Sequence, residues 1–78
     1  MADAPFGLRP GSILIDNDPR TYEDGKPARE VVLTSIGQTR GKWRAFYHGG
    51  YRRHSIACNR IFLDDGAPRH SGYNIVQI

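Results

Sequence analysis

One stretch of the chain interleaves cations with aromatic rings in the way that nucleic-acid binding requires. Its candidate contact residues are Arg40, Lys42, Trp43, Arg44, Tyr47, Tyr51, Arg52 and Arg53. Cations in a row bind phosphates, and exposed rings stack on bases, so the segment supplies both kinds of contact. Alternation along a strand places Lys42, Arg44 and His48 on one side. In the alternative, the rings fill a core or stabilise a hairpin, and the cations form a solvated rim.

Among the histidines and the cysteine, His54 and Cys58 lie closest in the sequence. On a strand, a spacing of four residues separates two side chains by roughly 13 Å, too far to share an ion. Zinc needs three or four ligands, and a cysteine nucleophile needs an oriented base. We therefore expect no metal, no cofactor and no catalytic residue. Cys58 is predicted to be a buried structural thiol, and the protein is not expected to be an enzyme.

The polar segment from Asp16 to Pro27 is predicted to be a long loop. It contains four acids, but Arg20 stands where a calcium loop would need its third alternate ligand. Tyr22 lies in this loop, where it could form a groove with Trp43 similar to the peptide groove of SH3 domains. This pair suggests an alternative function, a protein-binding adaptor or a phage-type inhibitor of a host protein.

The elements that hold these groups are predicted to be five short strands, at residues 12–15, 29–36, 42–48, 51–57 and 73–78. Gly49-Gly50 predicts a two-residue hairpin turn, because both positions tolerate a positive φ. Asn59–Leu63 lacks strand alternation and predicts a single 3₁₀ turn. The expected core is Ile13, Ile15, Val32, Leu33, Phe46, Ile56, Ile61, Phe62 and Ile75.

Length and composition limit the domain organisation. The chain has 78 residues, of which 38% are hydrophobic, and a single cysteine, so no disulfide forms within it. We expect an irregular lead-in at residues 1–10 and one domain at residues 11–78. There is no apolar run of membrane-spanning length, and the first residues do not resemble a secretory signal. The sequence therefore predicts a cytoplasmic protein that does not enter a membrane.

Charge is distributed unevenly between the two halves of the chain. Residues 1–39 carry four Lys and Arg against six Asp and Glu, a net charge of −2. Residues 40–78 carry seven against two, a net charge of +5. Such asymmetry favours a polyanionic partner for the second half.

The layout of the whole chain also resembles a known family. The residues that carry the resemblance are the Gly11-Ser12-Ile13 opening, the loop 16–27, the runs 31–36 and 43–47, the Gly49-Gly50 turn, the segment 56–61 and Gly72-Tyr73. Together they resemble small SH3-like β-barrels of bacteria and phages, including the KOW-type domains of ribosomal and transcription-elongation proteins. The resemblance implies an all-β, five-stranded closed barrel that binds RNA, DNA, a nucleoprotein complex or a peptide. The basic second half favours nucleic acid or a nucleoprotein complex among these partners.

Overall fold

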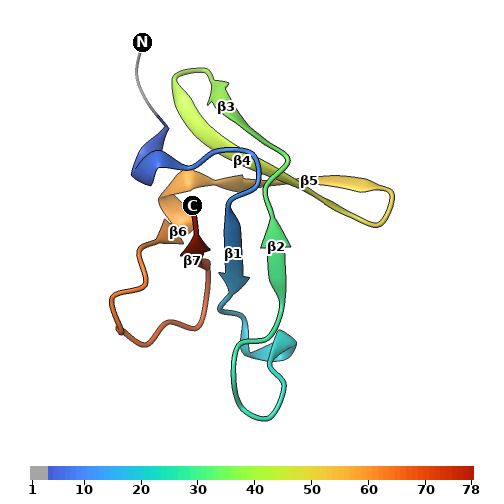
Figure 1. The fold of residues 1–78 in the computed structure, drawn as a ribbon, viewed down its shortest axis with the longest axis vertical. Helices are drawn as coiled ribbons and strands as arrows, with labels where there is room; N and C mark the ends of the chain where they lie inside the picture. Colours follow the sequence, from blue (N-terminus) through green and yellow to red (C-terminus); the bar gives the residue numbers. More distant parts are fainter. Residues whose placement is uncertain (1–3) are drawn as a thin grey trace.

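The computed structural model describes residues 4–78 and is all-β, as predicted (Figure 1). Short 3₁₀ turns are the only helical elements in this range, namely η1 (Pro5–Gly7), η2 (Pro19–Thr21) and η3 (Cys58–Arg60). The strands are β1 (Ile13–Asp16), β2 (Glu30–Val32), β3 (Ser35–Thr39), β4 (Lys42–Gly49), β5 (Arg52–Ala57), β6 (Ile61–Phe62) and β7 (Tyr73–Gln77). No helix among these residues has the length and apolar character needed to cross a membrane.

The strands form two sheets, so the prediction of one closed, five-stranded barrel is wrong. One sheet has the order β2-β1-β7-β6, and the other is the meander β3-β4-β5. Within the described residues no hydrogen-bonded pairing joins β5, at the edge of one sheet, to β6, at the edge of the other. The turn η3 connects these two edge strands, and the sheets stay open at that side.

The predicted strand 29–36 is divided between the two sheets. β2 ends at Val32 and β3 begins at Ser35, so Leu33 and Thr34 carry the chain from one sheet to the other. The Leu33 amide donates to the Ser12 carbonyl at 2.9 Å, whereas the Thr34 amide donates to the Phe46 carbonyl at 2.8 Å. This division and the two-residue strand β6 give seven strands instead of five.

Two tight turns build the three-stranded meander. Arg40 and Gly41 join β3 to β4 with φ values of 53° and 78°, as a type I′ turn requires. Gly50 and Tyr51 join β4 to β5, and of these two only Gly50 has a positive φ, 63°, which is typical of a type II′ turn. The turn therefore lies one residue beyond the predicted Gly49-Gly50 pair, because Gly49 still pairs with Arg52.

The core lies between the inner faces of the two sheets. It is formed by Leu8, Leu14, Val31, Leu33, Ala45, Tyr47, Ile56, Cys58, Ile61 and Ile75. Cys58 is a free thiol, and its burial raises the pKa of the thiol above the ordinary value. Leu8 packs into this core although it falls in the predicted lead-in, whose residues 1–3 lie outside the described part of the chain.

Four of the nine predicted core residues are buried, namely Leu33, Ile56, Ile61 and Ile75. The remaining five are half-buried, except Val32, which is 53% exposed. The reason is strand parity. Leu14 faces the core between Val31 and Ile75, so its neighbours Ile13 and Ile15 face outward.

Candidate nucleic-acid interface

The outer face of the sheet β3-β4-β5 gathers most of the cations of the predicted binding segment. Along β4, Ala45 and Tyr47 face the core, so the alternate residues face solvent. These outward residues are Lys42, Arg44, Phe46 and His48. Register adds Arg53 from β5 opposite His48, and adds Ser35 from β3 and Ser55 from β5 on either side of Phe46. We call this set the basic face.

Phe46 is the centre of the basic face. The guanidinium carbon of Arg53 lies 4.0 Å from the centroid of the Phe46 ring, a cation–π contact. The same guanidinium donates from Nη2 to the Ser35 hydroxyl at 3.3 Å. Beside it, Arg44 donates from Nη1 to the Ser55 hydroxyl at 3.2 Å. Neutral partners thus orient both guanidinium groups and leave their charges uncompensated.

Acidic residues are absent from the three strands of this sheet, although Glu30 of β2 lines a cavity beside His48. No Asp or Glu occurs between Val31 and Leu63, a segment that contains all of β3, β4 and β5. The ion pairs within residues 4–78 are Arg20–Asp18, Arg29–Asp16 and Arg69–Asp65, and none of them lies on this sheet. The basic face therefore presents a positive potential that anions can neutralise.

Three predicted stacking rings occupy different environments. Trp43 is half-buried against the core and lines an apolar cavity with Phe6 and Cys58. Tyr47 is only 6% exposed and stacks on His54, with ring centroids 5.1 Å apart, so its ring cannot reach a base. Tyr51 is fully exposed at the β4–β5 turn. Of these three rings, Tyr51 alone is free to stack.

Phe46 is the functional candidate that the sequence prediction placed in the core. The available signal was its parity, because Phe46 alternates with Lys42 and Arg44 along β4. Two predicted contacts, Arg40 and Arg52, lie at opposite ends of the meander, in the β3–β4 turn and beside the β4–β5 turn. Arg52 pairs with Gly49 and therefore faces the side on which Tyr47 lies, away from the basic face.

The two residues of the predicted peptide groove do not come together. Trp43 lies near the β3–β4 turn, and Tyr22 lies in the loop between β1 and β2. These segments occupy opposite ends of the molecule (Figure 1). No cavity in the described part of the chain is lined by both side chains. Residues 4–78 likewise contain no cluster of three or more His, Cys, Asp or Glu side chains that could hold a metal ion.

No protein-family model matches the chain, and no curated protein or solved structure is significantly similar to it. The resemblance to SH3-like barrels therefore stays a prediction. The basic face is the feature from which a function can be inferred.

Proposed function

We propose that the protein binds nucleic acid through the basic face of the sheet β3-β4-β5. The observation that carries this proposal is that Lys42, Arg44 and Arg53 share the outer face of one sheet, with Arg53 over the Phe46 ring, and that this sheet has no carboxylate. Guanidinium groups are planar forks that bind phosphate oxygens in pairs. Such a surface suits a phosphodiester backbone, because its cations are spread along β4 and β5 rather than gathered at one point.

Base contacts come from the aromatic part of the same surface. The Arg53 guanidinium lies over the Phe46 ring, so its outer side offers a planar cation on which a base can stack. Tyr51 offers a second ring at the tip of the β4–β5 hairpin. Stacking of this kind needs bases that are not paired with a second strand, so single-stranded RNA or DNA is the proposed ligand class.

The resemblance to SH3-like barrels agrees with this proposal, because nucleic-acid binding is among the functions it implies. The role proposed here is binding without catalysis. The adaptor alternative loses its groove, because Tyr22 and Trp43 line no common cavity.

Fluorescence anisotropy with labelled oligonucleotides tests the proposal. Short single-stranded and duplex forms of RNA and DNA are titrated with the protein over a series of salt concentrations. Contacts to about three to five phosphates predict a log–log salt slope of roughly −2 to −5, with single strands bound more tightly than duplexes. Absence of binding to all four ligands at low salt would refute the proposal and favour a protein partner.

A further inference from the structure

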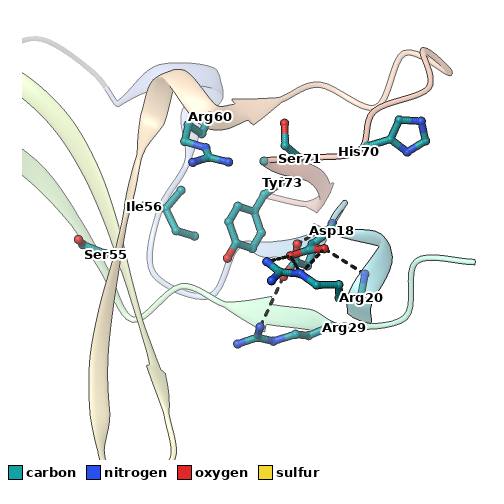
Figure 2. Close-up of a pocket in the computed structure, with 11 residues that line it drawn as sticks. Asp18, Arg20, Arg29, Ser55, Ile56, Arg60, His70, Ser71 and Tyr73 are labelled. Atoms are coloured by element: carbon teal, nitrogen blue, oxygen red, sulfur yellow. Dashed lines mark hydrogen bonds and ion pairs between the residues drawn. The ribbon is translucent and has the colours of Figure 1, made fainter. Parts of the chain in front are cut away.

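A second candidate site lies outside the basic face, in a cavity of about 480 Å³ (Figure 2). It occupies the open side of the molecule, between β5 and the start of β7. Four separate segments line it, namely the end of β1 with the loop that follows, the approach to β2, the end of β5 with η3, and residues 70–73. Its volume falls within the range of small-molecule sites.

Gly72 and Asn17 fix the wall of this cavity. A Cβ atom at Gly72 would lie 2.6 Å from the Arg60 carbonyl oxygen, and Gly72 has a φ of 73°, so no other residue fits there without strain. Asn17 is buried and donates from Nδ2 to the Ser71 carbonyl at 3.2 Å and to Asn74 Oδ1 at 2.9 Å. The segment that carries Ser71 and Tyr73 is thereby held against η3, which carries Arg60.

The two carboxylates that line the cavity are already engaged. Asp18 forms hydrogen bonds with the Arg20 guanidinium at 2.7–3.2 Å, which hold the pKa of the Asp18 carboxyl below its ordinary value. Asp16 is buried and accepts the Asp18 amide on Oδ1 at 2.9 Å. Its other oxygen lies 3.5 Å from Arg29 Nη1, a long contact.

The arginines of the cavity outnumber its acids. The cavity is lined by three arginines, Arg20, Arg29 and Arg60, and by two acids, Asp16 and Asp18. The net charge of this set is +1, not counting His70. Within residues 4–78, Arg60 has no acidic partner. Figure 2 shows Arg60 above the Tyr73 ring and Arg29 below it, with Arg20 between Tyr73 and Arg29.

Hydroxyl groups complete the set of donors. Ser71 and Tyr73 both line the cavity. Burial, and then the neighbouring Tyr47 hydroxyl, raise the pKa of the Tyr73 phenol well above its ordinary value, so that it keeps its proton. Guanidinium and hydroxyl donors surround the space, and the acidic acceptors that could hold a cation are occupied.

We propose that this cavity binds a phosphate monoester, with Arg60 as its principal ligand. A monoester carries more charge and more free oxygens than a phosphodiester, and the Arg60 fork, which has no acidic partner within residues 4–78, is free to donate to them. Two sources share this chemistry, a free nucleoside monophosphate and the phosphorylated end of a strand. The cavity shares Ser55 with the basic face, but its arginines lie outside the sheet β3-β4-β5, so the two proposals can be tested with different arginine variants.

Titration followed by ³¹P NMR tests this site with inorganic phosphate and with a nucleoside 5′-monophosphate. Saturable binding is expected, with a dissociation constant of about 1 mM or lower. Arg60→Gln removes the unpaired guanidinium and should weaken binding about tenfold or more, whereas Arg60→Lys should restore part of it. Arg9→Gln is the matched control, because it removes the same charge from an exposed position outside the cavity lining.

An equal loss in the Arg9→Gln and Arg60→Gln variants, or no saturation by either ligand at about 10 mM, would overturn the proposal.

Oligonucleotides with a 5′-phosphate or a 5′-hydroxyl then identify the source of the phosphate. Tighter binding of the 5′-phosphorylated strand, lost in Arg60→Gln, assigns the site to a strand end. Equal binding of the two strands, with the monophosphate still bound, assigns it to a small molecule. Arg53→Gln separates the two proposals, because it should weaken strand binding and leave monophosphate binding unchanged.

Discussion

The outer faces of the two sheets differ in chemistry although both belong to short antiparallel strands exposed to solvent. The four-stranded sheet exposes the apolar side chains of Val32 and Val76, with Glu30 at its edge. The three-stranded sheet exposes Lys42, Arg44 and Arg53, with Arg53 over the Phe46 ring. Hydrophobic burial explains both inner faces equally well, so it says nothing about function. Only the charge pattern of the outer faces distinguishes a surface fitted for a polyanion.

The largest expected effect concerns the inner faces of the sheets. It tests which residues of β1 point into the core and which point outward. Leu14→Ala should lower the free energy of unfolding by about 2–5 kcal/mol, because it leaves a cavity in the core. Ile15→Ala is the matched control on the outward side of the same strand and should cost about 1 kcal/mol. Urea unfolding measures both values. Equal losses, or a larger one for Ile15, would contradict the assigned register.

The second effect concerns the basic face. Arg44→Gln combined with Arg53→Gln removes two guanidinium groups that have no acidic partner, and should weaken single-strand binding at low salt about 100-fold. The salt slope should also become shallower by about one to two units. The control, Arg9→Gln with Lys26→Gln, makes the same change in net charge in the first half of the chain. Anisotropy should show a loss of less than about threefold for this control; similar losses in both variants would mean that net charge alone decides binding.

The third effect separates stacking from charge at one position. Phe46→Leu keeps an apolar side chain under Arg53 but removes the ring. Affinity for single strands should fall by about 1–3 kcal/mol, and the salt slope should stay nearly constant, because stacking releases few counterions. Tyr47→Phe changes a buried ring that cannot reach a base and should leave affinity unchanged. A change of slope in Phe46→Leu would show that the ring acts only by positioning Arg53.

The smallest effect concerns an exposed ion pair beside the apolar face. Arg69 stacks over Phe62 and pairs with Asp65, which lowers the pKa of that carboxyl from 3.8 to about 2. A lowered folded-state pKa stabilises the fold above pH 3.8, and this stabilisation is lost as the pH falls toward 2. The melting temperature of the Asp65→Asn variant should therefore be slightly lower than that of the wild type at pH 6 and equal to it near pH 2. The control is Asp64→Asn, which removes a neighbouring carboxylate that forms no ion pair within residues 4–78 and should leave the melting temperature at pH 6 unchanged.

Much of the strand layout was predictable because its signals are local. The alternation of Lys42–Gly49 and the runs in β5 and β7 predict strands whatever surrounds them. The division of the run 31–36 was not predictable, because its residues favour a strand throughout and only contacts with Ser12 and Phe46 decide where the chain changes sheet. Ile13-Leu14-Ile15 is apolar at every position, so its parity depends on the partners across the sheet.

The two candidate sites also differ in whether their sequence signals are local. The basic face comes from one continuous hairpin region, so most of its cations could be recognised from their spacing. The ring at its centre was assigned to the core, since Phe46 is apolar and its exposure depends on register. The cavity was not recognised, because Arg29, Arg60 and Tyr73 lie far apart in the sequence and are brought together only by the two sheets.

Mapping the bound surface tests whether nucleic acid binds on the basic face. Amide chemical shifts of ¹⁵N-labelled protein are followed during titration with a short single-stranded oligonucleotide that lacks a terminal phosphate. We expect the shifts to concentrate on β4 and β5, around Arg44, Phe46 and Arg53, and to weaken when salt is raised. Shifts centred on β1, β2 and β7 of the apolar face, or none at low salt, would contradict it.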